Sequence, residues 1–166
     1  MGSKDNLQAA FAGESQANRK YLAFAKKAEK DGFPNVAKLF RAAAQAETVH
    51  AHKHLRTMGG INSTEDNLQV AIDGEGYEFK EMYPEFLEEA KKEGDKQAQT
   101  SFEYAMEAEK NHHEMYNEAK EAVKQGNDLS DRKIFVCNVC GHTTYDEAPD
   151  SCPVCGATKE QFDEIQ

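Results

Sequence analysis

Three things are missing from this sequence: a surplus of basic residues, a long apolar run, and cysteine outside one short segment. The 166 residues include 30 acidic and 20 basic side chains, a net charge of −10. A phosphate backbone would be repelled by that charge, so no nucleic-acid partner is expected. No apolar run approaches the roughly 20 residues of a membrane helix, and the N-terminal MGSKDNLQ lacks the apolar core of a secretory signal. We therefore expect no membrane association.

All four cysteines lie between Cys137 and Cys155, in two Cys-x-x-Cys pairs. Such pairs indicate a metal site in a reducing compartment rather than disulfides, and we expect a cytoplasmic protein. The chain is long enough for one core of roughly 100–150 residues and a small appendage.

What is present is an internal repeat. Residues 6–14 read NLQAAFAGE and residues 67–75 read NLQVAIDGE, six identities in nine at an offset of 61. Further along, five residues recur at an offset of 62: Phe40, Ala43, Ala46, Glu47 and His50 return as Phe102, Ala105, Ala108, Glu109 and His112. The carboxylates and imidazoles are therefore expected in two-fold-related positions.

Apolar residues at helical spacing predict four helices, over residues 4–30, 34–58, 66–93 and 95–125. Pro84 lies inside the third and predicts a kink or local break there. If the second pair of helices copies the first, the second helix must reach the third by a crossover along a bundle. A connector of ten extended residues spans at most about 35 Å, so that crossover is expected to be taut.

The repeat carries a lone glutamate and a Glu-x-x-His in each copy: Glu14 with Glu47 and His50, then Glu75 with Glu109 and His112. Residues i and i+3 are neighbours on one helical face. One Glu from each of two helices plus a Glu-x-x-His from each of two others is the di-iron carboxylate pattern of helix bundles. Any single Glu of this set is more simply an exposed helix residue, but the repetition in register favours a pair of metal ions.

Three residues stand beside this set. Glu78 lies one turn beyond Glu75 and has no anionic counterpart in the first copy, so it predicts a surplus ligand. Tyr21 and Tyr83 are repeat-related, and we expect their hydroxyls to donate hydrogen bonds to the ligand carboxylates. Packing in the core explains the two tyrosines nearly as well.

The cysteines form C-x2-C-x11-C-x2-C: Cys137, Cys140, Cys152 and Cys155. Four thiolates at this spacing indicate a tetrahedral site, and spacing alone favours structural zinc. Gly141 and Gly156 follow the pairs and permit turns in which backbone N–H groups point at the sulfurs. The run CPVCGATKEQF resembles rubredoxin, which implies one iron that carries one electron.

The segments FAGESQANRKY, AETVH, GEGYEFKEMYP and AEKNHHEMY, followed by the cysteine module, resemble the rubrerythrin family in that order. This resemblance implies a mainly α chain: a ferritin-like di-iron four-helix bundle over residues 1–130 and a rubredoxin-like module, with one iron on four cysteines, over residues 131–166. It also implies reduction of hydrogen peroxide to water, in protection against oxidative stress. The electrons would come ultimately from NAD(P)H, through a partner such as rubredoxin or a reductase.

The resemblance also implies a role for each ligand. Glu47 and Glu109 would bridge two irons, Glu14 would serve one of them, and Glu75 with His112 the other. Glu78 and His50 would exchange on the first iron between oxidation states. The four cysteines would hold a third iron, for which zinc can substitute.

The linker GNDLSDR (residues 126–132) looks too short to fold the cysteine module far back, so we expect a head-to-tail homodimer that pairs one chain's cysteine site with the other's di-iron site. Two alternatives remain open. One is a ferroxidase or iron-handling ferritin-like protein that uses oxygen, and the other is a binding or sensor module with a zinc ribbon.

Overall fold

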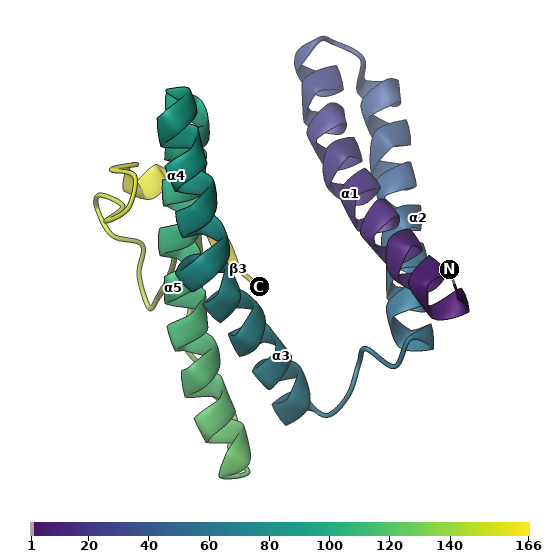
Figure 1. The fold of residues 1–166 in the computed structure, drawn as a ribbon. Coiled ribbons are helices and arrows are strands. Elements are labelled where there is room, and N and C mark those ends of the chain that lie inside the picture. The colour runs from purple at the N-terminus through teal and green to yellow at the C-terminus, as the bar shows by residue number, and fades with distance from the viewer. Residues whose placement is uncertain (1) are drawn as a thin grey trace. The chain divides into compact units, whose positions relative to one another are not determined.

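The computed structural model describes residues 2–166. They divide into two compact units along the chain, one ending at Asn62 and one beginning at Ser63. Helices make up most of both units, and strands occur only near the C-terminus of the described chain (Figure 1). The expected mainly α chain with a small C-terminal β module is confirmed.

The first unit is a hairpin of two helices, α1 (Ser3–Lys30) and α2 (Pro34–Thr57), which lie side by side (Figure 1). The turn between them uses Gly32 in the left-handed region, at φ +82°, and Pro34 begins α2, where its missing N–H is harmless. Small side chains let the two helices approach closely. The buried core of the hairpin consists of Ala25, Ala28 and Ala37, with Phe40 packed against it.

The second unit begins with α3 (Thr64–Tyr77), η1 (Glu78–Met82), α4 (Tyr83–Glu93) and α5 (Lys96–Lys124). The Ser63 side chain caps α3 by accepting a hydrogen bond from the Asp66 N–H at 3.1 Å. Because α2 ends at Thr57 and α3 begins at Thr64, only residues 58–63 connect them. The connector is therefore shorter than the ten residues expected.

The break predicted at Pro84 is a π-helical turn, η1, inserted between α3 and α4. The Tyr83 N–H donates to the Glu78 carbonyl, five residues back, which widens the helix just before the proline. The repeat explains why the turn is there. Glu14 and Glu75 are 61 residues apart but Tyr21 and Tyr83 are 62 apart, so the second copy holds one extra residue between them. The π turn accommodates it.

After the π turn, the two copies pack their aromatic side chains in the same way. In the first unit Tyr21, Phe24 and Phe40 form an aromatic cluster with ring-centroid distances of 6.4, 6.2 and 5.6 Å. The counterpart cluster has distances of 6.3, 6.2 and 5.6 Å and consists of Tyr83, Phe86 and Phe102. The repeat read in the sequence is thus a repeat of packing.

The chain ends in an antiparallel sheet of three short strands, in the order β2-β1-β3: β1 (Ile134–Cys137), β2 (Thr143–Tyr145) and β3 (Phe162–Ile165). A 3-10 turn, η2 (Lys159–Gln161), precedes β3. Its buried core is Cys137, Ala148, Cys152 and Phe162. The cysteines thus supply half of that core, so metal binding and folding of this module are coupled.

Candidate metal centres

The first ligand set lies within the first unit. Glu14 comes from α1, and Glu47 with His50 from α2. His50 Nδ1 is 3.0 Å from Glu47 Oε2 and 3.8 Å from Glu14 Oε1. Buried Asn18, one turn beyond Glu14, ties the helices together here by donating to the Ala44 carbonyl at 2.7 Å. We call Glu14, Glu47 and His50 half-site 1.

The second ligand set lies within the second unit and repeats this geometry. His112 Nδ1 on α5 is 2.8 Å from Glu109 Oε2 and 4.0 Å from Glu75 Oε1 on α3. We call Glu75, Glu109 and His112 half-site 2. Its histidine is better covered, with 27% of the side chain exposed against 54% for His50. Both copies therefore aim the same ring nitrogen at the same pair of carboxylates.

These distances fit a metal ion. Ligand atoms bonded at about 2.0–2.2 Å to one ion lie no more than about 4.4 Å apart. In each half-site the distances from the imidazole Nδ1 to the two carboxylate oxygens lie at or below 4.0 Å, within that limit. Carboxylate and imidazole ligands suit iron or manganese.

Electrostatics points the same way. Burial, followed by the charge of nearby Glu109, raises the pKa of Glu75 to about 7. Burial and Glu109 also raise the pKa of Glu78. Without a cation these carboxylates hold protons at a pH where a glutamate is normally ionised, because like charges crowd a poorly hydrated space. A divalent ion would relieve that repulsion.

The other predicted residues are placed less directly. Glu78 lies in the π turn and is not among the ligand atoms gathered at half-site 2. Tyr83 lies near it, since burial and then the charges of Glu109, Glu78 and Glu75 raise the Tyr83 pKa. Tyr21 packs in its aromatic cluster, and no hydrogen bond from its hydroxyl to a carboxylate is found within residues 2–166.

Sequence reasoning missed a further tyrosine. Partial burial, and after it the charges of Glu75 and Glu109, raise the pKa of Tyr116, although the residue is 37% exposed. Tyr116 lies four residues after His112, one turn along the same face of α5. This spacing could have indicated that Tyr116 lies next to His112 on the helix.

Thr143 was also missed, because no local sequence pattern indicates its contact with His112. His112 Nε2, the ring nitrogen pointing away from the carboxylates, is 2.9 Å from Thr143 Oγ1 on β2. The Thr143 N–H donates to Asn111 Oδ1 at 3.1 Å. The cysteine module therefore lies against α5 of its own chain, beside half-site 2.

This contact overturns the expectation that the linker is too short to bring the module back. Residues 125–133 can span about 30 Å, whereas Lys124 is about 18 Å along α5 from His112. The nine residues are enough. The distance argument for pairing the cysteine site with another chain's metal residues is therefore wrong.

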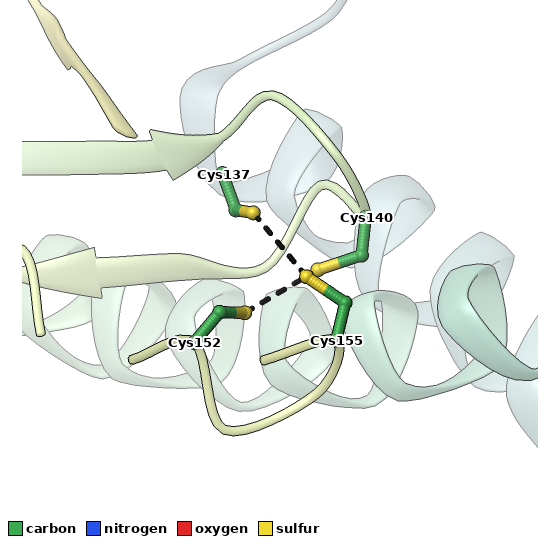
Figure 2. Close-up of side chains that lie close together, drawn as sticks. All are labelled: Cys137, Cys140, Cys152 and Cys155. Atoms are coloured by element: carbon green, nitrogen blue, oxygen red, sulfur yellow. Dashed lines mark hydrogen bonds between the residues drawn. The ribbon is translucent and has the colours of Figure 1, made fainter. Parts of the chain in front are cut away.

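The four cysteines converge from two loops (Figure 2). Cys137 Sγ is 3.7 Å from Cys155 Sγ, and Cys140 Sγ is 3.5 Å from Cys152 Sγ. Four sulfurs bonded at about 2.3 Å to a central ion lie about 3.8 Å apart in a tetrahedron. The sulfurs are too far apart for disulfides, and they fit one tetrahedral metal ion.

The two loops have the same construction. The N–H groups of Gly141 and Gly156, both at positive φ, donate to the carbonyls of Cys137 and Cys152 at 2.9 Å. Backbone N–H groups point at the sulfurs, as expected. Burial alone would raise the pKa of the Cys152 thiol, but the N–H groups of Cys155 and Val154 hold that pKa below its ordinary value. Such hydrogen bonds stabilise thiolate charge and tune a redox potential.

No helix within residues 2–166 is long and apolar enough to cross a membrane.

Comparison with known proteins covers nearly the whole chain. The model of the rubrerythrin family matches residues 5–120, and that of the rubredoxin-like domain of rubrerythrin matches residues 135–163. Rubrerythrin-2 of Clostridium acetobutylicum is 38% identical, over 95% of this chain and 94% of its own length. Nigerythrin of Nitratidesulfovibrio vulgaris is 34% identical, over 95% and 84%.

Solved structures agree. The fully reduced, all-ferrous state of nigerythrin is similar with a TM-score of 0.59 and 33% identity, over 99% of this chain and 88% of that one. Its mixed-valence state gives a TM-score of 0.58 and 34% identity over the same shares.

Proposed function

Because the chain belongs to the rubrerythrin family, with the helical and the rubredoxin-like parts both matched, we propose that it reduces hydrogen peroxide to water. The reaction consumes two electrons and two protons for each peroxide. We assign the di-iron domain to residues 1–130 and the domain with one iron on four cysteines to residues 131–166. The observation that carries the proposal is the pair of matching half-sites, one of them hydrogen-bonded to the cysteine module.

The half-sites would together hold two iron ions, with Glu47 and Glu109 between them and Glu14, His50, Glu75 and His112 as terminal ligands. Glu78 would be the surplus ligand that exchanges with His50. When bound, two ferrous ions supply two electrons and polarise the O–O bond as Lewis acids, while the iron on the four cysteines supplies replacement electrons singly.

The chain's own residues supply position and protons. The i,i+3 spacing and the helix packing hold each imidazole against its carboxylate before any substrate arrives. Tyr83 and Tyr116 are candidate proton donors at half-site 2, because partial burial and the charges of its carboxylates raise the pKa values of both hydroxyls. We propose that these hydroxyls supply protons to a bound peroxide.

The length of the connector between α2 and α3 limits which two half-sites can form one di-iron centre. In a ferritin-like bundle, with its single long crossover, α2 and α3 run parallel. His50 and Glu47 lie about 13 Å before the end of α2, and Glu75 about 17 Å after the start of α3, so a crossover would cover about 29 Å. The seven Cα steps from Thr57 to Thr64 span at most about 25 Å. We therefore propose a homodimer in which the half-sites that meet belong to different chains.

The surface of each hairpin supports its packing against a further hairpin. The first carries large exposed hydrophobic side chains, among them Phe24, Val36, Leu39 and Val49, and the second carries Val70 and Phe86. Apolar residues in such number mark a surface that packs against another. A homodimer was also expected from the sequence. In the dimer proposed here, however, the chains share their helical hairpins rather than their cysteine modules.

The function is tested by reducing the iron-loaded protein anaerobically and adding peroxide or oxygen separately. Rapid return of the iron–thiolate colour with peroxide and slow return with oxygen is expected. Fast oxidation by oxygen, with more than about three irons taken up per chain, would favour the ferroxidase. Zinc on the cysteines and no colour would favour the binding module.

A matched pair of variants on α5 locates the chemistry. Glu109→Ala should abolish the response to peroxide, while Glu107→Ala, at an exposed neighbouring position, should retain it. Equal responses from the two variants would contradict the ligand assignment. The physiological electron donor that we propose is a rubredoxin or an NAD(P)H-dependent reductase in a reducing cytoplasm.

A further inference from the structure

The contact between α5 and the cysteine module supplies a hydrogen-bond partner for the outer nitrogen of His112, Nε2. Thr143 Oγ1 lies 2.9 Å from His112 Nε2 and 3.2 Å from the Gly141 carbonyl. The Thr143 hydroxyl, which has one proton, donates to the Gly141 carbonyl. The hydroxyl oxygen then accepts from His112 Nε2–H. When Nε2 donates to Thr143, the Nδ1 that faces Glu109 and Glu75 can give its lone pair to a metal ion, in place of the hydrogen bond that it shares with Glu109.

The same threonine fastens the module to the helix. Its backbone N–H donates to Asn111 Oδ1, and the residue is 8% exposed. At Gly141 the backbone comes close to α5, so that a Cβ added there would lie 3.8 Å from the Ala108 Cβ. A short stretch of chain, Cys140 to Thr143, therefore runs from a metal-binding sulfur to the imidazole of half-site 2.

We propose that Thr143 is a positioning residue for the metal at half-site 2: it holds His112 in the metal-binding tautomer and seats the cysteine module against it. A hydrogen bond to the outer nitrogen of a ligating histidine fixes ring orientation and tautomer. The route from Cys140 through the Gly141 carbonyl and the Thr143 hydroxyl to His112 also links the two metal sites within one chain. This inference rests on the proposed function for the metal at half-site 2.

Half-site 1 lacks this device. His50 is about half exposed, and no hydrogen bond from its Nε2 is found within residues 2–166. Thr143 has no counterpart in the first copy, because the cysteine module is not repeated. The support of the metal ligands is thus unequal although the ligands themselves match, and half-site 1 serves as an internal control.

The test uses full-length protein with iron in the cysteine site and Mn(II) as the probe, followed by the EPR signal of the free ion. In Thr143→Val, which keeps the shape and loses the hydroxyl, one Mn(II) should bind about 10- to 100-fold more weakly and the other unchanged. Thr143→Ser should bind like the wild type. So should Thr144→Val, whose hydroxyl faces the Tyr145 carbonyl at 3.5 Å.

A second readout follows electron transfer. Return of the iron–thiolate colour after peroxide should be slower in Thr143→Val than in Thr143→Ser, with the same absorption spectrum in both showing an intact cysteine site. Equal Mn(II) affinities in wild type and Thr143→Val, or equal losses in the Val and Ser variants, would overturn the proposal. A wild type that binds Mn(II) but leaves peroxide unreduced would overturn the proposed function alone.

Discussion

The two helical hairpins begin from one pattern and end with different properties. Their aromatic clusters agree within 0.1 Å in ring separation, and both aim a histidine Nδ1 at two glutamates. Yet only the second carries a π turn with Glu78 and a bond from its histidine to Thr143. The ligand sets are the same in the two copies, and the surroundings that tune them are not.

The largest effect on activity is expected from an experiment that distinguishes a di-iron centre shared between two chains from one formed within a single chain. One variant, Glu47→Ala with His50→Ala, loses half-site 1; another, Glu109→Ala with His112→Ala, loses half-site 2. Each alone should be inactive. In mixed dimers of the two, a centre shared between chains joins the two intact halves once per heterodimer.

Co-refolding equal amounts should therefore restore about a quarter of wild-type peroxide reduction, since random pairing makes half the dimers mixed. Centres built within one chain would each lack a half, and the mixture would stay inactive. That result would refute the exchange of hairpins without touching the proposed reaction.

The second-largest effect is expected from removing the charge of Glu78. Glu78→Gln should leave two metal ions bound, because each half-site keeps its three ligands, while peroxide reduction falls about 10- to 100-fold. Metal analysis and steady-state rates check this together. Glu81→Gln, in the same π turn, is the control and should change neither. A Glu78 variant with full activity would show that the asymmetry has no part in the reaction.

A smaller effect concerns the metal-free protein and its pH dependence. Glu75 has a pKa of about 7 in the fold against an ordinary value of 4.5, so the folded state binds more protons between these values. The stability that this proton contributes is complete below about pH 4.5 and lost as the pH rises through about 7. Chelated protein should therefore unfold more easily at pH 8 than at pH 5.

Urea denaturation in the presence of a chelator measures this, and Glu75→Gln should flatten the slope. Exposed Glu103→Gln on α5 should leave it unchanged. The same crowding predicts a lower melting temperature without metal than with it. Equal melting temperatures would argue against a buried metal site.

The smallest effect compares matched positions in the two hairpins. Asn18 is 8% exposed and donates to the Ala44 carbonyl and to Thr48 Oγ1, so Asn18→Ala should cost about 1–2 kcal/mol of unfolding free energy. Its counterpart at the offset of 62, Lys80, is exposed, and Lys80→Ala should change stability by less than about 0.5 kcal/mol. Thermal denaturation distinguishes the two, and equal costs would show that Asn18 does not secure half-site 1.

Local spacing was sufficient for the helices and for the pairing of each histidine with its glutamate, because neighbours at i and i+3 need no knowledge of the fold. Local spacing could not predict the role of Thr143, because 31 residues separate it from His112 and the two meet only when the cysteine module packs against α5. The connector failed for another reason. Helix ends are read from sequence to within a few residues, and the six residues that join α2 to α3 are fewer than the ten assumed.

The π turn has a consequence for how a duplicated protein diverges. Two equal hairpins can change by substitution, which alters side chains but leaves their angular positions around the helix axis alone. Adding one residue rotates everything beyond it by about 100°. The widened turn absorbs that rotation within five residues, so Tyr83 and Phe86 return to the places that Tyr21 and Phe24 hold. One extra residue thus changes the backbone around Glu78 in the second copy and leaves the packing beyond the turn unchanged.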